Sequence, residues 1–303
     1  RDCLLSRGLG DVYKRQLEYD KIIDRLVSFA ASDKAKERLK KLVPMTDIHD
    51  INAALSETSD ALSRVYAKGA VSFSGVHDVG ASVKRLEIGS SLNTVELLHI
   101  SSLLTAAARV KNYYEDTTDS LTGYFHALEP LTPLNTEIKR CILSEDEISD
   151  DASPNLRRIR RSIKSCEEKI HSQLISLVNG SYRTYLQDAV ITMRDGRYCI
   201  PIKSEYKGQV PGMVHDQSST GSTFFVEPMA VVKLNNDIRE LEIEEAKEIE
   251  VILSTLSAQA DLHRDEIRYD LENMVELDFI FARAALATVS YTHLRAHETR
   301  GNL

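Results

Sequence analysis

The chain has 303 residues, of which 42% are hydrophobic and 28% are charged, and its formal net charge is −8. This composition is typical of a globular protein, and the negative balance argues against a surface coated with basic residues for nucleic acid. No apolar run approaches the roughly 18 residues of a membrane-spanning helix. The cysteines form no Cys-x-x-Cys pair, so neither a zinc site nor a disulfide framework is indicated, and we expect a cytoplasmic protein.

The two ends of the chain differ from the rest. Residues 1–16 and 289–303 show no sustained helical or strand periodicity, and each meets a strongly patterned segment abruptly. Both resemble translated adapter sequence, so we treat them as non-native and exclude them from the fold prediction. Residues 17–288 are then expected to be a fragment of a longer protein. The alternative is a genuine basic tail at each end.

Residues 17–135 predict a helical core. Apolar residues recur there every three or four positions in successive segments, which is the period of helices that bury one face. Thr46 is the expected N-cap of one helix, and Asn93 followed by Glu96 predicts a capping box at the start of another. Polar, proline and glycine residues from 117 to 133 predict a connection.

Two longer helices are predicted in residues 136–183 and 230–288. Ser153 before Pro154 is a strong start signal, because the serine oxygen accepts an orphan amide and proline suits the first turn. Apolar residues then form a seam along each helix: Leu156, Ile159, Ile163, Cys166, Ile170, Leu174 and Leu177 in the first, and Leu234, Ile238, Leu241, Ile249, Ile252 and Leu256 in the second. Two long coiled-coil-like helices joined by an insertion are expected to pair antiparallel.

Opposite charges gather in these two helices. Residues 157–169 contain six basic side chains, and residues 237–250 contain seven acidic ones. Each run lies near the start of its own predicted helix, so in a full-length antiparallel hairpin the two runs are expected near opposite ends and not in contact. The basic run is then either a solvated face or a surface that contacts nucleic-acid phosphate or a neighbouring domain.

Residues 184–229 predict a β-rich insert between the two helices. Four strands are expected, at residues 189–193, 198–202, 210–215 and 222–226. Asp195-Gly196 is a strong hairpin signal because both positions tolerate positive φ. A β insertion between two long helices indicates a gripping tip on a helical arm.

The candidate nucleic-acid contacts are basic, amide and hydroxyl side chains, which are the types that bind phosphate oxygens. They are Arg194, Arg197, Lys203, Lys207, His215, Gln217, Ser218 and Ser219 in the insert, and Arg157, Arg158, Arg160 and Arg161 in the first long helix. The insert also contains carboxylates, so any contact there depends on a few arranged groups and not on a general cationic patch.

No motif for catalysis or nucleotide binding occurs in the sequence. It has no Gly-x-x-x-x-Gly-Lys-Ser/Thr phosphate loop, no His-Glu-x-x-His and no Gly-x-Ser-x-Gly. His215 and Asp216 lie close to Ser218 and Ser219, but adjacent strand residues point to opposite faces, so a polar turn is a better interpretation than a catalytic triad. We therefore predict no catalytic residue, metal ligand or cofactor site within this chain.

Four ordered stretches carry a family resemblance. They are LEYDKIIDRLVSFAAS, DASPNLRRIRRSI, YLQDAVITMRDGRYCIPIKSEYKGQVPGMVHDQSSTGSTFFVEP and VVKLNNDIRELEIEE. Together, over residues 17–288, they resemble the N-terminal half of the second bacterial MutS family, MutS-II. The resemblance implies a mainly α fold, with a helical core bundle, a long antiparallel two-helix lever and a small antiparallel β clamp at the lever's tip.

The resemblance also implies functions for the longer protein. In that family the polypeptide continues into an ABC-type ATPase that dimerises and then into a C-terminal Smr nuclease domain, so ATP, magnesium and the homodimer contact are expected outside this chain. The family acts on branched or recombining DNA, whose recombination it suppresses, and some members rescue collided ribosomes. The resemblance does not decide whether DNA or the ribosome is the partner. The alternative is a stand-alone helical adaptor with a protein-binding β tip.

Overall fold

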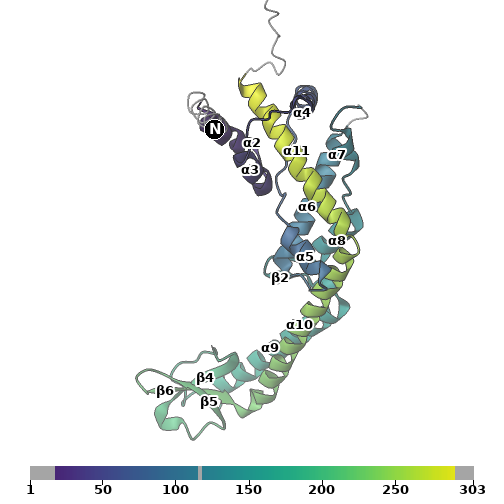
Figure 1. The fold of residues 1–303 in the computed structure, drawn as a ribbon. Helices are drawn as coiled ribbons and strands as arrows, with labels where there is room; N and C mark the ends of the chain where they lie inside the picture. Colours follow the sequence, from purple (N-terminus) through teal and green to yellow (C-terminus); the bar gives the residue numbers. More distant parts are fainter. Residues whose placement is uncertain (1–17, 115–117, 291–303) are drawn as a thin grey trace, which may run out of the picture. The chain divides into compact units, whose positions relative to one another are not determined.

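The computed structural model describes residues 18–114 and 118–290, which form two compact units. Unit 1 comprises the residues up to 147 and those from 253 onward, and unit 2 comprises residues 148–252. Helices dominate, and two small sheets complete the described part (Figure 1). The predicted mainly α fold with a β insertion is confirmed. The segments predicted to be non-native lie outside the described residues, except Val289 and Ser290, which continue the last helix.

Unit 1 is a helical bundle with one long helix at its centre. Its elements are α2 (Tyr19–Phe29), α3 (Asp33–Lys40), α4 (Ile48–Lys68), α5 (Gly80–Glu87), α6 (Thr94–Tyr113), α7 (Thr122–His126), α8 (Thr132–Cys141), β1 (Ile142–Ser144), β2 (Glu147–Ile148) and α11 (Arg264–Ser290). The end of α10 (Met229–Asp261) also belongs to this unit. The helices α2 to α7 all contact α11, which therefore carries most of the packing (Figure 1).

Two helix starts in unit 1 test the sequence signals directly. At α6, the Asn93 side chain accepts a hydrogen bond from the Glu96 amide at 2.9 Å, and Glu96 accepts one from the Asn93 amide at 2.9 Å, so the predicted capping box is confirmed. At α4, the N-cap is Asp47 and not Thr46, because the Asp47 carboxylate accepts from the amides of His49 and Asp50. The Thr46 prediction was therefore wrong by one residue.

A buried carboxylate joins α11 to the junction between α2 and α3. Asp278 is only 1% exposed, and its oxygens accept hydrogen bonds from the Ala31 amide at 3.1 Å, the Ser32 amide at 2.7 Å and the Ser32 hydroxyl at 2.6 Å. The backbone between two helices has orphan amides that need acceptors. Asp278 supplies these acceptors from a helix more than 240 positions along the chain.

Unit 2 is a helical hairpin that carries a four-stranded sheet. Its elements are η1 (Asp150–Ala152), α9 (Pro154–Asn179), β3 (Thr192–Arg194), β4 (Arg197–Lys203), η2 (Ser204–Tyr206), β5 (Gly212–Gln217), β6 (Thr223–Pro228) and most of α10. The sheet has the order β3-β4-β6-β5, and all neighbouring strands are antiparallel. α9 starts at Pro154 with Ser153 as its cap, as the sequence predicts, whereas the predicted range 136–183 also includes the end of α8 and the two-stranded sheet.

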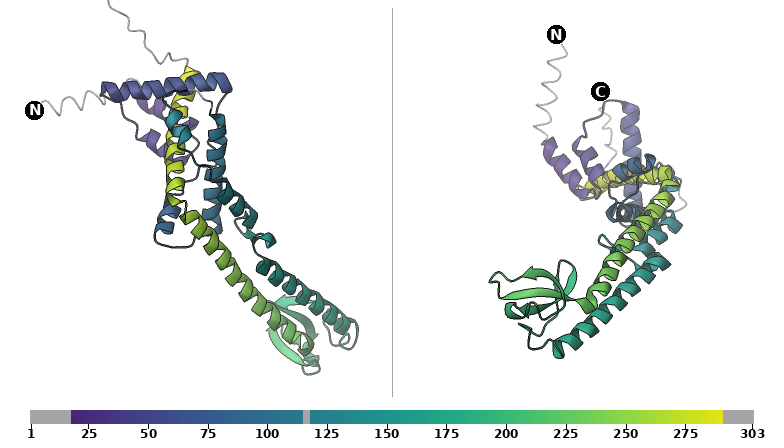
Figure 2. Two further views of the ribbon diagram at one scale, coloured as in Figure 1. Left: turned by 90° about the vertical axis from the view of Figure 1, so that its right-hand side faces the viewer. Right: turned by 90° about the horizontal axis from the view of Figure 1, so that it is seen from below.

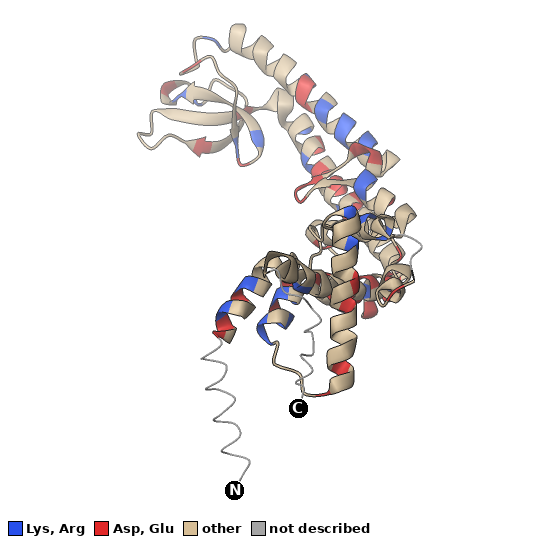
Figure 3. Ribbon diagram, turned by 90° about the horizontal axis from the view of Figure 1, so that it is seen from above, with Lys and Arg blue, Asp and Glu red and all other residues tan. Residues whose placement is uncertain are grey.

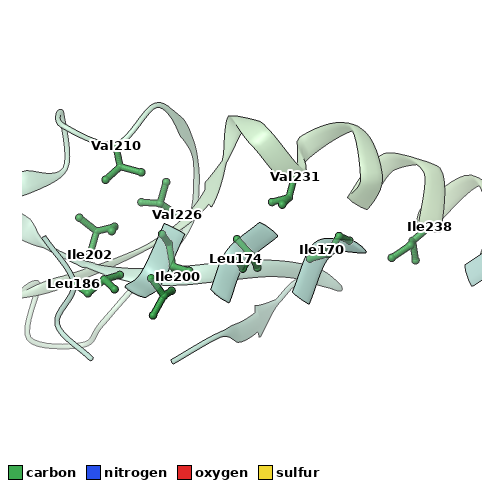
Figure 4. Packing of buried hydrophobic residues seen from close by; sticks show 10 residues of the cluster. Ile170, Leu174, Leu186, Ile200, Ile202, Val210, Val226, Val231 and Ile238 are labelled. Atoms are coloured by element: carbon green, nitrogen blue, oxygen red, sulfur yellow. The ribbon is translucent and has the colours of Figure 1, made fainter. Parts of the chain in front are cut away.

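The two long helices lie side by side and run antiparallel (Figure 2). Ser153 and Asn155 at the start of α9 contact Glu248, far along α10, whereas apolar residues near the end of α9 share a cluster with those near the start of α10. The buried members of this cluster are Ile170, Leu174, Val178, Leu186, Ile200, Ile202, Val210, Val226, Val231 and Ile238 (Figure 4). One core therefore joins both helices to the β insert.

The charge runs of α9 and α10 contact each other, contrary to the sequence prediction. Arg160 Nε pairs with Glu245 at 2.7 Å, and Arg158 pairs with Glu244 at 3.6 Å. The prediction failed because it counted each run from the start of its own helix. The register of an antiparallel pair is set where the insert joins the two helices, at Asn179 and Met229. The basic run precedes the end of α9 by about as many residues as the acidic run follows the start of α10, so the two runs face each other.

Candidate nucleic-acid interface

A tight turn shapes the first hairpin of the insert. Asp195 and Gly196 have φ angles of 49° and 72°, so both occupy the left-handed region that the sequence signal requires. The turn pairs Arg194 with Arg197 across the two strands. Like charges at directly opposed positions repel each other, so each of these arginines needs its own counter-charge.

Arg194 finds its partners on the neighbouring strands. Its guanidinium lies 3.9 Å from the centre of the Phe225 ring, and its Nε is 3.2 Å from the Asp216 carboxylate. Lys207 lies over the Phe224 ring at 4.2 Å in the same way. Both cations therefore cover aromatic rings of β6, and both keep part of their charged ends at the surface.

Arg197 and His215 point into the insert and not outward. Arg197 Nη1 donates to Glu227 at 3.0 Å, and His215 Nε2 lies 2.6 Å from the other oxygen of that carboxylate. Glu227 is completely buried. The sequence placed both residues among the nucleic-acid candidates, and the structure places each of them in contact with the buried Glu227 carboxylate.

The polar loop after β5 contains the remaining candidates of the insert. Gln217 donates to the Gly221 carbonyl at 3.2 Å, and the Ser218 hydroxyl accepts from the Thr223 amide at 3.1 Å. Both side chains therefore hold the loop in shape. Ser219 and the half-buried Lys203 form no side-chain hydrogen bond or ion pair with any described residue.

The basic run of α9 divides into an inward and an outward part. Arg160 is 28% exposed and binds Asp150, Glu245 and the Ile148 carbonyl. Arg157 pairs with Asp151, and Arg158 pairs with the acidic run of α10. Three of the four predicted arginines are thus neutralised by carboxylates of the same unit.

The outward part is a row of cations at helical spacing. Arg161, Lys164 and Lys169 are all exposed, and none forms an ion pair or a side-chain hydrogen bond with a described residue. Figure 3 shows Lys and Arg gathered along one long helix of this unit. Lys164 follows Arg161 by three positions and Lys169 follows it by eight, so the three side chains fall within about 140° of the helix circumference. We name them the α9 cation row. The prediction included only Arg161, although the spacing also identifies the two lysines.

Three further properties of the described residues concern a buried thiol, metal ligands and membrane helices. Burial raises the pKa of the Cys199 thiol to about 12, so it stays protonated at neutral pH and is a poor nucleophile. Residues 18–114 and 118–290 contain no group of three or more His, Cys, Asp or Glu side chains that could hold a metal ion. In the same ranges, no helix is both long enough and apolar enough to cross a membrane.

The sequence of the chain is similar to the sequences of known proteins. No family model matches the sequence. The chain is 61% identical to endonuclease MutS2 of Lachnospira eligens over 272 residues, which are 89% of this chain and 35% of that protein. It is 56% identical to endonuclease MutS2 of Agathobacter rectalis over 282 residues, which are 91% of this chain and 36% of that protein. It is 52% identical to endonuclease MutS2 of Lachnoclostridium phytofermentans over 284 residues, 90% of this chain and 36% of that protein.

The fold and the exposed cations define a class of helical proteins in which a β insert extends from a two-helix arm. Within that class, the chain belongs to the MutS-II family. It spans about a third of the length of the curated relatives that it matches. The family resemblance seen in the sequence is therefore confirmed, and it applies to the part of the relatives that this chain covers.

Proposed function

We propose that this chain is the substrate-contacting clamp and lever of a MutS-II protein, and that it binds the sugar-phosphate backbone of nucleic acid. The α9 cation row supports this proposal, because its three charges are exposed and have no counter-charge among the described residues. Phosphate contacts of this kind depend on charge and not on base sequence. They suit either branched, recombining DNA or the ribosomal RNA of a collided ribosome.

The catalytic steps would belong to the longer protein. The sequence contains no phosphate loop, so we assign the sites for ATP and magnesium to the longer protein. An ATPase and a nuclease elsewhere in the protein would supply these activities, and the ATPase would hold two copies together. Paired α9 and α10 helices are stiff enough to carry an ATP-driven displacement, so two arms would close around the substrate.

Charge reversal of the row tests this function. We expect Arg161→Glu/Lys164→Glu to weaken binding of the full chain to a fluorescent four-way DNA junction by roughly tenfold, and to lower the slope of log K against log salt by about two. The matched control is Lys40→Glu/Lys41→Glu, which reverses two neighbouring exposed charges on and just after α3. Equal effects of the two double variants would reject the proposal.

The same proteins distinguish the two kinds of nucleic acid. Sedimentation with purified ribosomes, under the salt conditions of the junction assay, measures binding to ribosomal RNA. A loss specific to the row variant with ribosomes alone identifies the ribosome as the partner, and a loss with the junction alone identifies DNA. If the row variant binds both the junction and the ribosome as wild type does, the α9 cation row is only a solvated helix face and the proposal is rejected.

One observation favours an adaptor function as the second candidate. β5 is an edge strand of the four-stranded sheet, and its Met213 and Val214 side chains are 41% and 42% exposed. Edge strands with exposed apolar side chains can pair with an extended segment of another protein. If Met213→Lys abolishes binding to a partner while the row variant has no effect, the adaptor interpretation replaces the nucleic-acid one.

A further inference from the structure

A buried carboxylate lies where the β insert meets α10. Glu227, near the end of β6, is completely buried, and its two oxygens receive hydrogen bonds from three side chains. Arg197 Nη1 lies 3.0 Å from one oxygen, His215 Nε2 lies 2.6 Å from the other, and Asn235 Nδ2 donates at 2.7 Å. These side chains belong to β4, β5 and α10, so one carboxylate is in contact with three different elements.

Asn235 connects this network to the helix. It is 3% exposed, and besides Glu227 it binds the backbone of β4 with both ends of its amide. Its Oδ1 accepts from the Tyr198 amide at 3.2 Å, and its Nδ2 lies 3.4 Å from the Tyr198 carbonyl. On the next residue, Asn236 Oδ1 accepts from Arg197 Nη2 at 2.7 Å. The first two turns of α10 are thus hydrogen-bonded to the strand that lies beside β6.

The apolar core and the polar network constrain this geometry differently. Ile200 and Val226 of the sheet share a core with Leu174 and Val231 of the helices, and the hydrophobic effect that buries them is non-directional. Hydrogen bonds to a buried charge are directional, and leaving that charge without partners costs several kcal/mol. A rotation of the sheet on α10 would break several of them together.

We propose that Asn235 and Glu227 are positioning residues that fix the orientation of the β insert on α10, so that insert and helix move as one rigid body. This inference goes beyond the nucleic-acid proposal, and it holds whatever partner the insert contacts. It concerns the angle between the sheet and the helix and not only the stability of the fold. The network is therefore the coupling through which a displacement of the helix reaches the insert.

A distance distribution measures the proposed coupling. Spin labels are placed in the full chain at Ser219, in the exposed loop after β5, and at Lys247, on the exposed face of α10, through genetically encoded amino acids that leave the native cysteines unchanged. We expect one narrow distance in the wild type and a distribution at least twice as wide in Asn235→Ala. The control is Asp216→Ala, which removes the surface ion pair with Arg194 and is expected to leave the distribution narrow.

A merely structural role would give a different result. If Asn235→Ala lowers the melting temperature but keeps the wild-type distribution, the positioning role is rejected, because the apolar core then suffices to set the orientation. Should Asn235→Ala lose helicity by circular dichroism, Asn235→Asp is measured in its place, since it keeps the shape and removes the donor to Glu227. A narrow distribution in Asn235→Asp also rejects the proposal.

Discussion

At the scale of single residues, Asp270 on α11 is an unusual buried acid. It is completely buried, and one oxygen accepts from the Glu129 amide at 2.7 Å, while the other has no hydrogen-bond partner among the described residues. Burial raises the pKa of Asp270 from 3.8 to about 7. The folded state therefore favours the protonated acid, whereas the unfolded chain ionises it at an ordinary acidic pH.

Asp270→Asn should change how stability depends on pH. Because the folded pKa is raised, the contribution of Asp270 is fully present below the unfolded pKa of 3.8 and is lost as the pH rises through about 7. Asparagine stays neutral, so we expect the variant to gain stability relative to wild type across this window, by at most roughly 4 kcal/mol at about 1.4 kcal/mol for each pKa unit. Urea unfolding at pH 4, 6 and 8 measures the difference. A difference that stays constant over these pH values contradicts the assigned burial of the charge.

At the scale of elements, the features that were predicted best are turns and helix caps that depend on residues close together in sequence. The Asp195-Gly196 turn, the Ser153 cap and the capping box that starts α6 each depend on residues next to one another in sequence, so the sequence alone identifies them. The short helix α5 was missed, because it has only eight residues and begins with a glycine. The break before α11 was also missed, because the apolar period continues across it.

The candidate site was only partly predictable for the same reason. Sequence identifies which side chains carry charge, but their availability depends on long-range pairing. Arg160 and Arg161 are neighbours in sequence, yet one is held by carboxylates of two other segments and the other is exposed without a partner among the described residues. Arg197 and His215 were predicted as nucleic-acid contacts from their polarity alone, whereas their contacts with Glu227 depend on the strand order.

The stability of the α9–α10 hairpin should depend on Arg160 and not on the neighbouring Arg161. Arg160→Ala removes contacts to Asp150, Glu245 and the Ile148 carbonyl, and we expect it to destabilise unit 2 by about 1–2 kcal/mol because these groups are only partly exposed. Arg161→Ala is the matched control and should change the free energy of unfolding by less than about 0.5 kcal/mol. Urea unfolding followed by circular dichroism compares them. Equal losses would show that the ion pairs across the hairpin contribute nothing to stability.

At the scale of the whole molecule, each unit has an apolar core of its own. Leu174 lies in the cluster that joins the β insert to both long helices, and Leu104 of α6 is equally buried in unit 1. The chain passes between the units through α10 and through the segment around residue 148. Because each unit has its own core, we expect each to unfold as a separate cooperative unit. A substitution that leaves a cavity in one core should destabilise mainly the residues that pack around that cavity.

Hydrogen exchange on matched core variants tests this separation. Leu174→Ala is expected to cost about 2–5 kcal/mol and to speed amide exchange in α9, in the sheet and in the first half of α10, while α6 and α11 stay protected. Leu104→Ala, which removes the same atoms from the other core, should do the reverse. Exchange along α10 locates the boundary between the two cooperative units. Amides of α10 before residue 252 should exchange faster in Leu174→Ala, and those after residue 252 should exchange faster in Leu104→Ala. If both variants speed exchange equally throughout, α10 couples the two cores into one cooperative unit, and the expected boundary at residue 252 is wrong.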